Sequence, residues 1–254
     1  MRSVKIFSIA ATLAGVVLVL TAFINTKLLK TVNAGNSGFA VVELFTSEGC
    51  SSCPPADELV SKIQGEDIDK PVYILAYHVD YWNRLGWKDA FSSAEYSKRQ
   101  SQYASFLKLN SVYTPQIVVN GTTEFVGSEE KSLRRAIKTS LAKKPEALLN
   151  IEIAAINRNE AKLTYTTAGA DKNTTLLIAV LQKNAQTKVE HGENGGQTLS
   201  HVQIVRKIQA FVLTGNNGEA SIDLPAGFDT KKWEIIGFLQ NKANGSVIGA
   251  GRVN

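Results

Sequence analysis

The chain has 254 residues, of which 44% are hydrophobic and 20% charged, and a formal net charge of +5. That length and composition suit a folded protein with a substantial core and exclude a disordered chain. Residues 1–34 hold four basic residues and no acidic one, which leaves +1 for the remainder. A near-neutral body lacks the basic surface that nucleic-acid binding needs, so we expect no nucleic-acid partner.

Residues 1–34 are expected to be a signal peptide or an N-terminal anchor. Arg2 and Lys5 precede an apolar run over residues 6–24, and residues 32–34 (Val-Asn-Ala) form a weak cleavage site. The run is long for a signal peptide and close to the length that spans a bilayer, so both alternatives stay open. Either one predicts a periplasmic or secreted protein, membrane-anchored through residues 6–24 if the leader is retained.

A buried strand is predicted over residues 39–46, followed by Cys50-Ser51-Ser52-Cys53. Pro54 and Pro55 come next, and because proline is tolerated in the first turn of a helix, a helix is expected to begin there. The two cysteines are the only ones in the chain. A disulfide that closes so short a loop adds little stability, so the pair is interpreted as chemical.

The next elements are a second buried strand over residues 71–79, an aromatic loop over residues 80–92 and a helix to about residue 109. Thr114-Pro115 then precedes a hairpin whose turn is Asn120-Gly121, and a helix follows from about residue 128. From its position after the strand-helix-strand unit, the Thr114–Pro115 bond is predicted to be cis.

Beyond Pro145 the sequence changes to about seven short strands separated by turns, which is typical of an immunoglobulin-like sandwich. The predicted fold class is therefore an α/β thioredoxin-like N-terminal domain plus an all-β immunoglobulin-like sandwich. The predicted domains are a leader at 1–34, a thioredoxin-like domain with a helical insertion at 35–146 and a β-sandwich at 147–254.

A cysteine at the start of a helix has its thiolate stabilised by free backbone N–H groups and by the helix dipole. Cys50 is predicted to be the exposed nucleophile, and Cys53 the buried cysteine that resolves the mixed disulfide. Metal binding and an inert bridge are the alternatives.

The order of elements resembles thioredoxin. More closely, the chain resembles a bacterial family of exported thioredoxin-like proteins described only as a domain of unknown function. Four stretches carry the resemblance, and they span most of the chain after the leader: residues 42–57 (VELFTSEGCSSCPPAD), 78–89 (HVDYWNRLGWKD), 113–121 (YTPQIVVNG) and 192–206 (GENGGQTLSHVQIVR). The resemblance implies a fold and a site around the cysteines, but no substrate.

Other residues are candidates for the same site. Thioredoxins carry a buried carboxylate on the strand before the cysteines, and by this resemblance Glu43 is a candidate general base. Thr114 and Pro115 are expected to hold an extended partner, with Trp82 as part of an aromatic wall or as packing. His78 and Asp80 are possible accessory residues, each with a structural alternative. The glycine-rich segment 190–201, with His201 at its end, is either a loop that folds over the cysteines or a long surface connection, and it has no assigned role.

The predicted function is thiol–disulfide exchange outside the cytoplasm, on a protein or small molecule that contains a thiol or a disulfide. A redox partner would recycle the pair, and neither an organic cofactor nor a bound metal is expected. Two other classes remain. One is an envelope binding module with a permanent Cys50–Cys53 bridge. The other is a copper or zinc handler that uses Cys50, Cys53 and His78.

Overall fold

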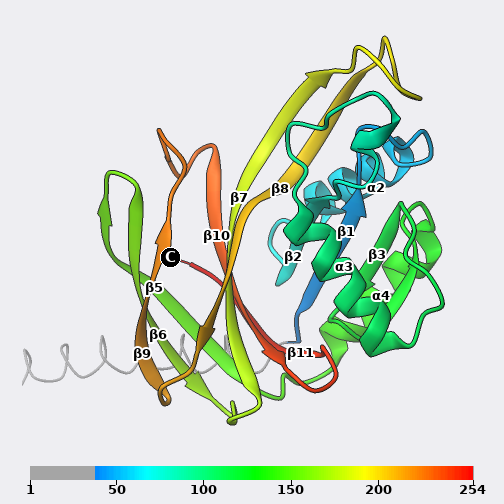
Figure 1. Ribbon diagram of the computed structural model, residues 1–254. Coiled ribbons are helices and arrows are strands. Elements are labelled where there is room, and N and C mark those ends of the chain that lie inside the picture. Colours follow the sequence, from blue (N-terminus) through cyan, green and yellow to red (C-terminus); the bar gives the residue numbers. More distant parts are fainter. Residues whose placement is uncertain (1–37, 254) are drawn as a thin grey trace, which may run out of the picture. The chain divides into compact units, whose positions relative to one another are not determined.

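Two fully buried parallel strands, β1 (Ala40–Thr46) and β2 (Val72–His78), are the first two strands in the part of the chain that the structure describes. The computed structural model describes residues 38–253, so the predicted leader lies outside the described residues (Figure 1). In the described part, no helix is long and apolar enough to cross a membrane.

Helix α2 (Pro54–Glu66) connects β1 to β2 and begins at the predicted proline pair. The other elements of this half are the short 3₁₀ helix η1 (Asn83–Leu85), α3 (Ala94–Leu107), β3 (Gln116–Val119), β4 (Thr123–Val126) and α4 (Glu130–Ala142). Strands β3 and β4 form the predicted hairpin. Asn120 and Gly121 have φ angles of 48° and 67°, as a tight hairpin turn of this type requires.

The second half consists of strands, whose existence and approximate positions follow the prediction. They are β5 (Leu148–Asn157), β6 (Glu160–Ala168), β7 (Thr174–Lys188), β8 (Thr198–Val212), β9 (Asn217–Asp223), β10 (Trp233–Asn241) and β11 (Val247–Arg252). Strands β7 and β8 are each 15 residues long and form an antiparallel pair. The pair extends to the edge of the sheet where β1 ends and α2 begins (Figure 1).

The pairing of these strands shows that the predicted fold class is wrong. A single eight-stranded mixed sheet has the order β11-β10-β7-β8-β2-β1-β3-β4, and a separate three-stranded sheet has the order β5-β6-β9. The large sheet joins strands from both sides of residue 146, and β8 lies parallel to β2, with Ala76 opposite Ile204. The fold is mostly β, and neither a thioredoxin-like α/β domain nor an immunoglobulin-like sandwich is present in residues 38–253.

The side chains of the large sheet alternate between two faces, as the pleat of a strand requires. In β1, Val42 and Leu44 contact α2 and α4, whereas Val41 and Phe45 face the side covered by α3. Residues of β7 and β10 join Phe45 in the core under α3, among them Leu177 and Phe238. The opposite face of β7 and β10 packs against the three-stranded sheet. The two halves of the chain therefore share a core.

Candidate functional site

The cysteine loop lies between the end of β1 and the start of α2. Cys50 and Cys53 are joined by a disulfide, with 5.4 Å between their Cα atoms. Cys53 occupies the N-cap position of α2, where its carbonyl accepts from the backbone N–H groups of Ala56 and Asp57. The predicted strand, cysteine pair and Pro-initiated helix therefore occur in the expected order.

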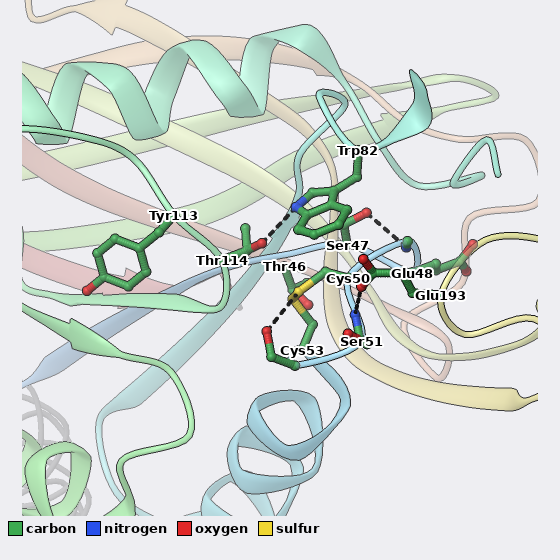
Figure 2. Close-up of a disulfide and its surroundings, with 12 residues drawn as sticks. Thr46, Ser47, Glu48, Cys50, Ser51, Cys53, Trp82, Tyr113, Thr114 and Glu193 are labelled. Atoms are coloured by element: carbon green, nitrogen blue, oxygen red, sulfur yellow. Dashed lines mark hydrogen bonds between the residues drawn. A yellow bond between two sulfur atoms is a disulfide. The ribbon is translucent and has the colours of Figure 1, made fainter. Parts of the chain in front are cut away.

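Both cysteines are completely buried, whereas Ser51 and Ser52 between them are exposed. The expectation that Cys50 is exposed is therefore wrong for this disulfide-bonded form. Figure 2 shows Trp82 and Thr114 among the residues that surround the disulfide. Trp82 also packs against the cysteine loop, since a Cβ atom on Gly49 would lie 3.3 Å from the Trp82 Cβ.

The connection between β7 and β8 contacts the cysteine loop from the other half of the chain. The side chain of Asn194 is buried, and its Nδ2 donates to the carbonyl oxygens of Glu48 (2.9 Å) and Cys50 (3.0 Å). The Ser51 N–H donates to Glu193 Oε2 at 3.0 Å (Figure 2). Hydrogen bonds from the side chain and the backbone of Ser51 lower the pKa of the Glu193 carboxyl. The segment that had no assigned role thus holds the backbone of the cysteine loop.

The residues predicted to bind a partner lie together. The Thr114–Pro115 peptide bond is cis, as predicted, and Trp82 Nε1 donates to Thr114 Oγ1 at 2.8 Å. Gly127 lies against both Pro115 and the first turn of α2. A Cβ atom on Gly127 would lie 2.9 Å from the Pro115 Cβ and 3.0 Å from the Ala56 Cβ. Their role in binding stays a prediction.

Glu43 lies on the face of β1 opposite to α2, which contradicts the geometry expected of a base for Cys53. Its carboxylate accepts two hydrogen bonds from the guanidinium of Arg99 on α3, at 2.5 and 2.9 Å, and another from the Tyr103 hydroxyl. Both charged residues are buried. Glu43 is therefore one half of a structural ion pair.

Asp80 also contacts α3 rather than the cysteines. Its carboxylate accepts a hydrogen bond from the Ser97 hydroxyl, whose oxygen in turn accepts from the Asp80 backbone N–H at 3.1 Å. This contact ties the end of β2 to the first turns of α3. These contacts favour a structural role for Asp80.

His78 belongs to a buried polar cluster that we call the histidine cluster: Glu48, Asp57, His78, Asp89 and His201, all with less than a tenth of their surface exposed. His78 Nδ1 lies 2.7 Å from Asp89 Oδ2. His201 lies between two carboxylates, with Nδ1 at 3.5 Å from Asp57 and Nε2 at 3.5 Å from Glu48. The two imidazole rings pack edge to face, with their centroids 4.8 Å apart.

The carboxylates of this cluster are held by neutral donors. Thr46 Oγ1 donates to Asp57 Oδ2, and Trp87 Nε1 donates to Glu48 Oε2, each at 2.7 Å. Burial lowers the pKa of His201, but hydrogen bonds to Asp57 and Glu48 outweigh it and raise that pKa to about 9. For Asp89, the attraction of His78 outweighs burial and lowers the pKa of the carboxyl.

Sequence reasoning singled out His78 but missed its partners. A signal was present, because Glu48 stands two residues before Cys50 and Asp57 four residues after Cys53. Three of the four stretches that carry the family resemblance also supply the cluster: 42–57, 78–89 and 192–206. In residues 38–253, the group of donor atoms close enough to share an ion holds Asp57, His78 and His201, and neither cysteine.

Comparison with known proteins identifies the family. The family described as "Protein of unknown function (DUF1223)" matches residues 41–240, most of the chain. The chain belongs to the DUF1223 family. The predicted resemblance to a domain of unknown function is thereby confirmed, whereas the comparison does not extend to a thioredoxin-like superfamily. The match includes the cysteine loop and every residue of the histidine cluster.

Among solved structures, protein AGR_C_4864 from Agrobacterium tumefaciens is similar at 28% identity, with a TM-score of 0.64. The alignment covers 84% of this chain and 92% of that one. A domain of the outer membrane lipoprotein Omp28 from Porphyromonas gingivalis is 10% identical, with a TM-score of 0.26, over 44% of this chain and 89% of that one. No curated protein matches this member of the DUF1223 family.

Proposed function

We propose that this DUF1223 protein carries out thiol–disulfide exchange through Cys50 and Cys53 outside the cytoplasm. The observation that carries the proposal is the disulfide between these two cysteines at the first turn of α2. Cys53 is the N-cap residue of α2 and Cys50 stands three residues before it, so the helix dipole favours a thiolate at this end of the helix. The near-bilayer length of the apolar run at 6–24 supports an extracytoplasmic location.

In the reduced protein, the Cys50 thiolate attacks a disulfide of the partner, forms a mixed disulfide and releases one partner thiolate. The Cys53 thiolate then attacks Cys50 Sγ, restores the internal disulfide and releases the second partner thiolate. Two electrons pass to the partner, and the protons of the two protein thiols end on the partner thiols. The reverse sequence oxidises a dithiol partner, and the direction depends on the redox potential.

Exchange requires access to sulfur atoms that are buried in the oxidised form. The β7–β8 connection and Trp82 are the parts that must move, because both contact the cysteine loop. Thr114 and Pro115 lie at the same end and would hold an extended partner once the loop opens. Glu43 has no part in this chemistry, since it faces α3.

A trapping experiment tests the assignment of the two cysteines. The Cys53→Ser variant is expected to accumulate a mixed disulfide with a model disulfide such as oxidised glutathione, because Cys50 has no resolving partner. The Cys50→Ser variant is expected to form much less of it at the same pH. Mass spectrometry of the intact chain after acid quenching measures both. Equal trapping by the two variants would remove the assignment of Cys50 as nucleophile.

A binding module with a permanent bridge is the second candidate, favoured by the complete burial of both cysteines. It predicts a disulfide that resists reduction by glutathione in the folded protein. Exchange predicts reversible reduction under the same conditions. Treating folded wild-type protein with reduced glutathione, and counting its thiols before and after unfolding, therefore separates the two candidates.

A further inference from the structure

Three polar atoms of the histidine cluster are buried and make no well-formed hydrogen bond: His78 Nε2, and the pair Glu48 Oε1 and His201 Nε2, which face each other at 3.5 Å. A buried polar atom without a partner is costly, so a set of three within one cluster needs an explanation. All three are lone-pair donors of the kinds that bind metal ions. Each residue is less than a tenth exposed.

The orientation of His78 is that of a metal ligand. Its Nδ1 is engaged by the Asp89 carboxylate at 2.7 Å, which leaves Nε2 free. Histidines that bind metals generally present one ring nitrogen to the ion while the other donates to a carboxylate. His201 has a similar arrangement, because its Nε2 lies 3.5 Å from Glu48 and can donate to it, while its Nδ1 lies beside Asp57 and can bind an ion there.

The distances suit a small divalent cation. One donor atom each from Asp57, His78 and His201 lie within 4.8 Å of one another. In a tetrahedral zinc site with bonds of about 2.1 Å, neighbouring donors are about 3.4 Å apart. The 3.5 Å separation of His201 Nδ1 from Asp57 Oδ1 matches that spacing. Bringing a pair of donors from 4.8 Å to that spacing takes a combined side-chain shift of about 1.4 Å.

The charge and access of the cluster also favour a cation. Three carboxylates surround two imidazoles, and their negative charge would balance that of a divalent ion. Asp57 and His201 line a cavity of about 400 Å³ between the start of α2 and β8, which provides an entry path.

We propose that Asp57, His78 and His201 form a binding site for a divalent zinc-type cation, with Glu48 holding the second ring nitrogen of His201. Two nitrogen ligands and one carboxylate, with the fourth position left for water, fit Zn²⁺ better than Cu(I), which prefers sulfur. The site is separate from the disulfide and does not depend on thiol chemistry. An ion there would join β1, α2, β2 and β8 beneath the cysteine loop.

Zinc titration of the full-length protein tests this site while the disulfide is kept oxidised. The chain has three histidines, and the exposed His191 provides a matched control. Chelator-treated wild-type protein and the His191→Gln variant are expected to bind one Zn²⁺ per chain in competition with a chromophoric chelator. The His78→Gln and His201→Gln variants are expected to bind it at least tenfold more weakly.

A spectroscopic measurement on wild-type protein removes the dependence on variants that fail to fold. Co²⁺ added to the oxidised protein is expected to give visible bands of tetrahedral intensity without a sulfur charge-transfer band. Zn²⁺ is expected to abolish these bands and to raise the thermal midpoint. Absence of bands together with absence of zinc binding would overturn the proposal. So would binding that is lost in His191→Gln, or binding that appears only after the disulfide is reduced.

Discussion

Glu43 and Glu48 lie five residues apart, and their buried side chains have different partners. Glu43 is within β1, where the alternation of the pleat turns it toward α3 and the guanidinium of Arg99. Glu48 follows the strand, where the chain turns toward α2 and brings its carboxylate to His201. Sequence reasoning recognised Glu43 as a buried charge in an apolar strand. It could not assign the partner, because Arg99 is 56 residues away.

The buried Glu43–Arg99 ion pair is expected to contribute to the stability of the fold. Arg99→Met leaves the Glu43 carboxylate buried without its partner, which is expected to lower the free energy of unfolding by about 3–5 kcal/mol. Urea denaturation measures the loss. Lys98→Met, at an exposed neighbouring position, is the matched control and is expected to change little. A shift in the redox potential of Cys50–Cys53 in folded Arg99→Met protein, absent from Lys98→Met, would show that Glu43 takes part in the chemistry.

Among the elements, the β7–β8 connection contacts the cysteine loop and is expected to control access to the disulfide. Its contacts to the cysteine loop are few and specific: two hydrogen bonds from Asn194 and one to Glu193. Sequence reasoning identified the glycine-rich segment as one that could fold over the cysteines. The contact between this segment and the cysteine loop could not be predicted. It depends on two 15-residue strands, which were expected to be short.

Removing the Asn194 contacts is expected to open the cysteine loop. In Asn194→Ala, two carbonyl oxygens lose their donor, which is expected to cost about 1–3 kcal/mol of stability. Reduction of the disulfide by dithiothreitol is expected to become several-fold faster, because the loop exposes the sulfur atoms more often. Stopped-flow thiol release measures the rate. An unchanged rate would show that access is controlled elsewhere, with Trp82 as the next place to test.

The Glu193 contact is expected to depend on pH. The hydrogen bonds from Ser51 lower the folded-state pKa of Glu193 below its ordinary value of 4.5. The contact therefore stabilises the loop above that value and is lost as pH falls through the lower folded-state pKa. Amide exchange at Ser51 is expected to gain protection from Glu193 only above this range. Glu193→Gln should weaken that protection, whereas Glu190→Gln, at an exposed position of the same segment, should not.

At the scale of the whole molecule, the sequence-based prediction located nearly every strand and helix but assembled them into the wrong fold. Local signals were sufficient for the hairpin at Asn120-Gly121 and for the helix at Pro54, since each depends on neighbouring residues. The pairing of β2 with β8 joins Ala76 to Ile204 and has no local signal. An apolar strand does not reveal which distant strand covers its edge.

The shared core gives a prediction for truncation. A chain that ends at residue 146 lacks β8, which pairs with β2, and lacks Leu177 and Phe238, which pack in the core with Phe45. It is expected to expose apolar surface and to unfold without a cooperative transition. Residues 38–253 are expected to unfold in one transition. Circular dichroism with heating compares the two. Cooperative unfolding of the shorter chain would support the predicted division at 146/147.

Equilibration of the full-length protein in a glutathione redox series decides whether the Cys50–Cys53 disulfide takes part in thiol–disulfide exchange. After acid quenching and alkylation, we expect a reversible two-electron transition in the folded protein, with a midpoint within the range of about −270 to −120 mV that thiol–disulfide exchange proteins occupy. A disulfide that stays oxidised at every ratio until the protein unfolds would contradict this expectation.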